Sequence, residues 1–294
     1  MSEILTLEQF REGVPGIYPS IPFPEYALHD AVNNSKLKEA AKSGAHLKVA
    51  LNEEKPDTES LMIGRAVHTA LLEPDLYARD YAIAPKCDRR TSDGKAIYNN
   101  FLADNFGKTV IDQATGVLCE QVRDSVMHHP IARKLMEAEG WCEQTFLAKD
   151  PLTDVLCKAR TDKYMIYEDR FTIVDLKTTV DASPDGFPRQ VAKYGYDMQG
   201  GFYTDIAANL QGVPHTEFII IAVEKKAPFA VTVWRMSHEA LAGGKTKYRA
   251  ALKTYINCTT TGLYPGWAED EMLDLSLPRW AEVEVTEEEE LVNG

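Results

Sequence analysis

Two aspartates and a lysine near the middle of the chain have the types and spacing that metal-dependent chemistry needs. Asp162 and Asp175 stand in two β-branched and aromatic runs that flank a charged break at Glu168 and Asp169, which is the pattern of a β-hairpin. A turn centred on this break places Asp162 opposite Asp175, with their Cβ atoms ~5 Å apart, whereas a three-residue turn would shift the partner by one. Lys177 then points to the same sheet face as Asp175, because strand side chains alternate.

The paired carboxylates predict a cation site. Two carboxylates so close repel each other unless a cation lies between them, and oxygen ligands with open positions suit Mg²⁺ or Mn²⁺ rather than Zn²⁺. Such an ion polarises a phosphodiester and lowers the pKa of a bound water, which Lys177 would orient. Lys177 could also neutralise charge on the phosphate. The alternative is a surface hairpin whose Asp–Lys ion pairs contribute little, and the Asp175-Leu-Lys177 triplet alone favours that alternative.

The segment after the hairpin favours the functional interpretation. Residues 183–211 are predicted to form one helix, on which five residues recur at steps of four, three, three and four and therefore share a face. They are Arg189, Lys193, Tyr196, Gln199 and Tyr203. These side chains suit a platform for phosphates and bases; the alternative is an amphipathic helix with its polar side in solvent. Gly200 and Gly201 cost ~1 kcal/mol each in mid-helix, which predicts a close approach to the backbone there.

His68, Glu143 and a charged loop are further candidates. His68 stands on a predicted helix, and as a metal ligand it needs the hairpin beside it; a lone helical histidine is more often packed or capped. Glu143, near the start of a predicted strand, would bridge to a metal-bound water or be an ordinary strand acid. In the loop over residues 85–95, Arg89 and Arg90 are candidate phosphate contacts, against the common case of a solvated loop.

Helices precede and surround the predicted strands. Residues 1–30, rich in proline and glycine, are expected to be irregular. Helices are predicted after the caps at 33–35, over 60–73, over 95–106 and over 114–139, the last broken near His128-His129-Pro130. Strands are predicted over 141–149, along both arms of the hairpin, over 215–223 and over 230–236, with a final helix over 239–261. This order predicts an α/β fold in which helices pack on a mixed β-sheet.

The net charge of −13 is unevenly distributed. Residues 267–294 contain ten acids and one base, so the rest of the chain is only mildly acidic and is compatible with a local basic groove. The acidic segment is expected to be a solvated tail; competition with DNA for that groove is a weaker idea. Five dispersed cysteines without a C-x-x-C spacing indicate reduced thiols and argue against a zinc or iron–sulfur site. No apolar run reaches membrane-spanning length and no secretory signal is visible, so we expect a cytoplasmic protein that does not associate with membranes.

Taken together, these motifs resemble the PD-(D/E)xK nuclease superfamily, and within it the RecE-type exonucleases (exodeoxyribonuclease VIII) and their phage-encoded relatives. The resemblance spans roughly residues 33–236. The matching stretches are Gly64–Pro74 for the histidine helix, Asp88–Lys95 for a loop of the phage branch, Lys158–Asp162 and Ile173–Thr179 for the two acidic motifs, and Tyr194–Tyr203 for the Q-x-x-x-Y motif. The chain departs from the pattern at Thr161, where proline is usual, and at Gly200 and Gly201, where alanines are common.

The resemblance implies roles for individual residues. His68, Asp162, Asp175 and the backbone carbonyl of Leu176 would bind the metal. Lys177 would be the catalytic lysine, and Glu143 corresponds to an upstream acid that supports the metal site. Gln199 and Tyr203 would position the scissile phosphate or the lysine. The residues expected to contact DNA are Arg89, Arg90, Arg160, Arg189, Lys193 and Tyr196.

The fold implied by the resemblance is a restriction-endonuclease-like core over residues 141–262, with a helical N-terminal part over 1–140 and an acidic tail over 263–294. The implied activity is Mg²⁺- or Mn²⁺-dependent 5′→3′ degradation of one strand of linear double-stranded DNA, which leaves 3′ single-stranded tails. The resemblance also implies a bacterial or phage-encoded protein that forms a ring and works with a single-strand annealing recombinase. The alternatives are an endonuclease or flap nuclease on the same scaffold and a non-catalytic DNA-binding assembly protein.

Overall fold

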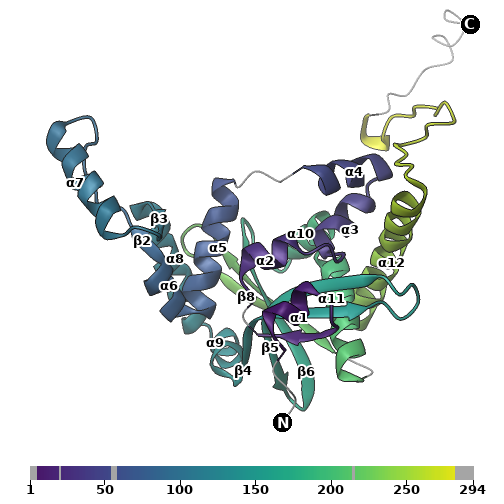
Figure 1. Ribbon diagram of the computed structural model, residues 1–294, viewed down its shortest axis with the longest axis horizontal. Helices are drawn as coiled ribbons and strands as arrows, with labels where there is room; N and C mark the ends of the chain where they lie inside the picture. Colours follow the sequence, from purple (N-terminus) through teal and green to yellow (C-terminus); the bar gives the residue numbers. More distant parts are fainter. Residues whose placement is uncertain (1–4, 20, 54–57, 214–215, 282–294) are drawn as a thin grey trace, which may run out of the picture.

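A six-stranded mixed β-sheet forms the centre of the molecule, as the order of elements predicts (Figure 1). The computed structural model describes residues 5–19, 21–53, 58–213 and 216–281. The strands, in sheet order, are β1 (Gly16–Tyr18), β4 (Gly140–Lys149), β5 (Leu156–Tyr167), β6 (Arg170–Thr179), β7 (Glu217–Glu224) and β8 (Val231–Arg235). Strands β6 and β7 are parallel, and all other neighbours in this sheet are antiparallel.

Helices cover both faces of the sheet. One face packs against α3 (Asn34–Ala40), α4 (Gly44–Asn52), α11 (Tyr196–Gln211) and α12 (His238–Thr261). The other packs against α5 (Glu59–Leu72), α8 (Gln113–His128) and α9 (Pro130–Glu137). Alternate residues along the strands divide between the two cores: Ile173 belongs to the first, whereas Val174 and Leu176 belong to the second. The predicted mixed α/β architecture is therefore confirmed.

The central hairpin has the predicted register. The pairs run from Tyr167↔Arg170 at the turn to Lys163↔Val174. Glu168 and Asp169 both have positive φ, 48° and 60°, as a two-residue hairpin turn that follows the sheet twist requires. The ladder ends at Lys163↔Val174, so the next two residues of the register, Asp162 and Asp175, lie where the two strands separate.

The helix predicted over residues 183–211 is in fact two helices, α10 (Phe187–Tyr194) and α11. Gly195 between them has a φ of +63°, a left-handed conformation that ends α10 and that glycine adopts without steric cost. The prediction of one continuous polar face was therefore wrong. Arg189 and Lys193 lie on α10, whereas Gln199 lies on α11.

The close approach predicted at the paired glycines is made by α12. A Cβ atom on Gly201 would lie 2.5 Å from the backbone nitrogen of Lys245, and one on Gly244 would lie 1.9 Å from the carbonyl oxygen of Asp197. A Cβ atom on Gly200 would meet Met236, which precedes α12, and Leu241 of α12. The glycines of this segment therefore allow the backbones of α11 and α12 to touch.

Residues 5–29 are more regular than expected. They form α1 (Leu7–Arg11), β1 and α2 (Phe23–Leu28). Thr6 and Gln9 cap α1 reciprocally, a signal that the proline-rich composition obscured. Strand β1 pairs with β4 through Gly16↔Leu147, and it extends the central sheet. The N-terminal segment is thus attached to the sheet rather than irregular.

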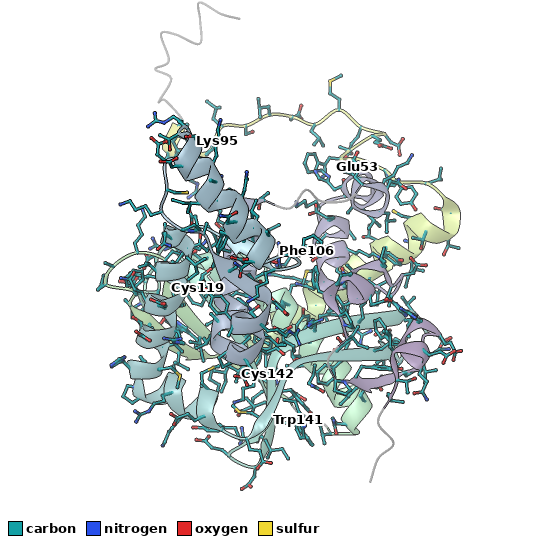
Figure 2. All side chains as sticks on the ribbon, turned by 60° about the vertical axis from the view of Figure 1, so that its left-hand side comes forward. Glu53, Lys95, Phe106, Cys119, Trp141 and Cys142 are labelled. Carbon is teal, nitrogen blue, oxygen red and sulfur yellow. The ribbon has the colours of Figure 1, made fainter. Side chains whose placement is uncertain are left out.

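The remaining elements form a projection beside α5 and α8. They are α6 (Pro74–Asp80), β2 (Tyr81–Ile83), α7 (Ser92–Asp104) and β3 (Thr109–Ile111), and a short 3₁₀ turn (Arg279–Ala281) follows α12. Strands β2 and β3 are parallel, and α7 extends away from the body (Figures 1 and 2). Among the described residues, no helix has the length and apolarity needed to cross a membrane.

Candidate active site

Asp162 occupies the gap where β5 and β6 separate. Its Oδ2 atom accepts a hydrogen bond of 2.7 Å from the backbone N–H of Leu176. The Asp162 side chain therefore takes the place of the backbone hydrogen bonds between β5 and β6, which end at Lys163↔Val174. The same oxygen lies 3.4 Å from Nδ1 of His68, which α5 brings to this edge of the hairpin. The structure therefore places the predicted histidine beside the first predicted aspartate.

Three side chains from three elements form a potential metal-binding group. His68 of α5, Glu143 of β4 and Asp162 of β5 each offer one ligand atom, and these atoms all lie within 4.8 Å of one another. All three side chains are half-buried, so an ion there would be partly shielded from water. Two carboxylates and one imidazole fit a divalent cation such as Mg²⁺ or, with its greater tolerance of nitrogen, Mn²⁺.

Glu143 has an unusual backbone for a strand residue. Its neighbours pair as Cys142↔Lys163 and Gln144↔Thr161, which places Glu143 opposite Asp162, but that pair is missing from the ladder. The φ of Glu143 is +52°, a conformation that costs energy for any residue other than glycine. Such strain in a half-buried acid that faces another acid indicates a functional position.

Arg160 holds the Glu143 carboxylate in place. Its Nε donates to Oε2 of Glu143 at 2.5 Å, and its Nη1 donates to the carbonyl oxygen of Ile21 at 2.6 Å. The guanidinium is therefore shared between the metal-binding group and the N-terminal segment. A DNA contact by Arg160 stays a prediction, and it would use the remaining N–H groups of the guanidinium.

Asp175 and Lys177 form a second, deeper part of the site. Lys177 Nζ lies 2.6 Å from Oδ2 of Asp175, and Gln199 of α11 donates to Oδ1 at 2.8 Å. Asp175 is only 2% exposed. The ammonium of Lys177 also lies 4.9 Å from the ring centroid of Tyr196, a favourable cation–π position. Gln199 thus orients Asp175, and Asp175 with Tyr196 fixes Lys177.

The carboxylates of the site have opposed pKa shifts. Burial raises the pKa of Asp175, and the nearby charge of Asp162 adds to this, against the opposing effect of Lys177. Burial and the charge of Asp162 likewise raise the pKa of Glu143. Burial also acts to raise the pKa of Asp162, but His68, Lys177 and the Leu176 N–H outweigh it and the pKa is lowered. Such opposed shifts in one cluster are typical of catalytic sites.

The two basic side chains of the site have raised pKa values. Burial acts to lower the pKa of His68, but the charge and hydrogen bond of Asp162 outweigh it, and the pKa is raised. For Lys177, burial is likewise outweighed by Asp175 and Asp162. Both shifts favour the protonated forms, because those forms carry the positive charge that the neighbouring carboxylates attract.

Tyr203 lies one turn after Gln199 on α11, is partly buried and packs against the core. Its ring centroid is 6.4 Å from that of Phe218, in an edge-to-face arrangement. Burial raises the pKa of its hydroxyl well above the usual value, with smaller contributions from neighbours that include Asp175. The hydroxyl therefore stays protonated and can donate a hydrogen bond near the site.

The other predicted DNA contacts divide into two groups. Arg189 and Lys193 are exposed on α10, and Lys193 lies 5.4 Å from the ring of Tyr194. Arg89 and Arg90 lie in the loop before α7, the helix whose outer tip is marked by Lys95 in Figure 2. The Arg89 guanidinium covers the ring of Tyr98 at 4.7 Å, and Arg90 pairs with Asp88 at 3.0 Å. The structure does not bring this second group to the metal-binding group.

Lys38 is a basic residue beside the site that sequence analysis missed. Its Nζ on α3 lies 5.4 Å from the centroid of the same Tyr196 ring that Lys177 contacts. In the sequence it stands in an ordinary polar run with Lys36 and Glu39, so only the fold reveals its position.

Comparisons with known proteins agree with this fold. A family described as "PDDEXK-like domain of unknown function (DUF3799)" matches residues 33–271. The crystal structure of a "Putative exonuclease" from Eubacterium rectale aligns with a TM-score of 0.57 at 16% identity, covering 88% of this chain and 96% of that one. A second solved structure, SSO0001, aligns over 76% of this chain and 85% of its own at 14% identity, but its TM-score of 0.27 is too low to bear on the fold. No curated protein sequence matches the chain.

Proposed function

The chain belongs to the family of PDDEXK-like DUF3799 domains, and on this premise we propose that it is a metal-dependent exonuclease that degrades linear double-stranded DNA. The observation that carries the proposal is the meeting of a His–Glu–Asp group with a buried Asp–Lys pair at the gap between two strands. Hydrolysis of a phosphodiester needs a cation, an activated water and a positive charge near the phosphate. This arrangement offers a residue for each need.

His68, Glu143 and Asp162 would hold the ion, with Asp175 and the Leu176 carbonyl as the further ligands that the sequence predicts. When bound, the ion would supply Lewis-acid polarisation of the phosphate and acidify a water. The ammonium of Lys177 would orient that water or neutralise charge that develops on the phosphate. Gln199 would keep Asp175 aligned and Tyr196 would keep Lys177 aligned, so Gln199 and Tyr196 have positioning roles.

The choice of an exonuclease rests on two arguments. The structural neighbour from Eubacterium rectale carries that description, and the sequence resembles RecE-type enzymes. The resemblance also suggests 5′→3′ polarity, and the resulting 3′ single strands would be substrates for an annealing recombinase. Arg189 and Lys193 on α10 and Lys38 on α3 are the basic residues that we propose as contacts to the DNA strand.

One experiment tests activity, metal requirement and polarity together. Linear duplex labelled at either the 5′ or the 3′ end is incubated with the protein in Mg²⁺, in Mn²⁺ and in a chelator, next to closed circular DNA. We expect metal-dependent release of the 5′ label as mononucleotide and no cutting of circles. Early release of the 3′ label would show that the enzyme degrades DNA in the 3′→5′ direction. Cutting of closed circles would favour an endonuclease.

Two substitutions connect that activity to the site. Lys177→Met should reduce nucleotide release by at least about a hundredfold, because the site loses its catalytic cation. Lys253→Met removes an exposed lysine from α12 and serves as the matched control, for which we expect full activity. Thermal unfolding curves check that both variants are folded. Full activity in a folded Lys177→Met variant would refute the proposed site.

A further inference from the structure

A row of aromatic rings runs from the core to the surface beside the active site. Trp234 of β8 packs on Phe187 of α10 with ring centroids 5.9 Å apart, and Phe187 lies 6.4 Å from Tyr196. Tyr194 completes the row, with its ring centroid 5.8 Å from that of Tyr196. The first three side chains are buried or half-buried, whereas Tyr194 is 46% exposed. The row therefore ends in a ring that a ligand can reach.

The break between α10 and α11 creates this end of the row. On one continuous helix, residues two apart point in different directions and do not face each other. The left-handed turn at Gly195, with a φ of +63°, instead brings the rings of Tyr194 and Tyr196 together at an interplanar angle of 31°. Tyr194 is also more exposed than Tyr196 and Tyr203, the two other tyrosines near the site. It is therefore the tyrosine best placed to receive a flat ligand.

Tyr194 lies close to the group that would act on the phosphate. The Lys177 ammonium is 4.9 Å from the Tyr196 centroid, and that centroid is 5.8 Å from the Tyr194 centroid. The ammonium and the Tyr194 ring are therefore no further apart than these two distances together. This separation is on the scale of one nucleotide, whose sugar keeps its base away from its phosphate. A strand with a phosphate at Lys177 can thus place a neighbouring base at Tyr194.

Two further ammonium groups border the same pair of rings. Lys38 Nζ on α3 lies 5.4 Å from the Tyr196 centroid. Lys193 Nζ lies 5.4 Å from the Tyr194 centroid. Lys38 approaches the α10–α11 junction closely, because a Cβ atom on Gly195 would lie 3.6 Å from its Cε. Rings bordered by cations are typical of surfaces that bind single-stranded nucleic acid, where bases stack on the rings and cations follow the backbone.

We propose that Tyr194 stacks on a base of a single DNA strand beside the cleaved phosphodiester. Lys38 and Lys193 would contact the backbone of that strand. The inference rests on the proposed function and specifies its substrate, because a base can stack on Tyr194 only after it has left its partner strand. The end of a duplex must therefore be unpaired where it enters the site. Stacking on a ring tolerates every base, so we expect removal of nucleotides without sequence preference.

Binding without cleavage is the first measurement, made in a chelator with a single-stranded oligonucleotide. One probe carries 2-aminopurine at its 5′ end and a second carries it at its 3′ end, since the fluorescence of this base falls when it stacks. We expect the wild type to quench one of the probes. Tyr194→Ala should remove the quenching and weaken binding roughly tenfold or more, whereas Tyr194→Phe should preserve both. The matched control is Trp280→Ala, which removes a ring that is 87% exposed after α12 and should leave binding unchanged.

An abasic nucleotide at the quenched position separates stacking from a structural role of the ring. The wild type should bind the abasic oligonucleotide as weakly as Tyr194→Ala binds the intact one, and Tyr194→Ala should not distinguish the two. Thermal unfolding checks that every variant is folded.

Three results would overturn the proposal. They are a wild type that binds no oligonucleotide, equal binding of intact and abasic strands by the wild type, and wild-type affinity in Tyr194→Ala. A wild type that releases nucleotides from linear duplex but ignores the missing base would leave the nuclease proposal standing and refute the stacking site alone. Stacking at Tyr194 without any metal-dependent release would refute the nuclease proposal instead.

Discussion

Glu143 combines a left-handed backbone with a carboxylate that faces a second carboxylate. Either feature alone would be selected against in the middle of a strand, because the first strains the chain and the second creates repulsion. Next to His68 and Asp162, the cation of the proposed function would offset both costs. The sequence gives no indication of the strain, since the residue is not a glycine.

Comparison of Glu143→Gly with Glu143→Ala should isolate that strain. Both variants lose the carboxylate, but only glycine relieves the φ of +52°. We therefore expect Glu143→Gly to be more stable than Glu143→Ala by about 1 kcal/mol, measured by urea unfolding without metal. Equal stabilities would show that the backbone relaxes to an ordinary strand when the carboxylate is removed.

At the scale of elements, the contact between α11 and α12 requires a glycine at position 244 but not at position 243. Gly243 and Gly244 are adjacent in α12, yet a Cβ on Gly243 meets nothing within 4 Å, whereas one on Gly244 would overlap the backbone of α11. This asymmetry makes the two positions a matched pair, in which helix propensity is held constant and only the packing differs.

Gly244→Ala and Gly243→Ala should therefore change stability in opposite directions. Gly244→Ala should destabilise the fold by about 2 kcal/mol or more, because α12 must move away from Asp197. Gly243→Ala should stabilise it by about 0.5–1 kcal/mol through better helix propensity. Chemical denaturation of both variants beside the wild type measures the difference, and stabilisation by both would show that the helices have room between them.

Local signals in the sequence predicted several elements well. The charged pair Glu168-Asp169 indicated a two-residue turn, and this was enough to obtain the hairpin register and the opposition of Asp162 and Asp175. The break at Gly195 was missed because the surrounding residues keep helical spacing. The meeting of His68 and Lys38 with the hairpin could not be predicted, because it depends on how α5 and α3 pack on the sheet.

At the scale of the whole molecule, two bases of β5 attach the N-terminal segment to the sheet. Arg160 binds the Ile21 carbonyl, and Lys158, which has no exposed surface, donates to the carbonyl oxygens of Tyr26 and His29 at the C-terminal end of α2. Both lie in the run that leads to Asp162. The segment before residue 30 and the metal-binding group are therefore connected through one strand.

Lys158 should make stability rise with pH. Burial, followed by the charge of Lys36, lowers its pKa to about 7, whereas an unfolded lysine titrates near 10.4. Between these values the unfolded chain binds more protons, so the cost of burying Lys158 is largest below pH 7 and declines as the pH rises. Against Lys158→Gln, wild-type stability should increase from pH 7 to pH 9 by at most about 1.4 kcal/mol per pH unit. Urea unfolding at several pH values gives this difference, and parallel curves would contradict it.

The parallel pairing of β2 and β3 has a consequence for how this molecule can vary. The chain leaves β2 after Ile83 and enters β3 at Thr109, which pairs with Tyr81. Residues 84–108, called here the arm, are therefore an excursion whose two ends are held by one small sheet. A helix inserted in this way can gain or lose turns without displacing any strand of the central sheet. Each added turn would move the tip outward by ~5.4 Å, so the reach of the arm can change while the small sheet at its base stays fixed.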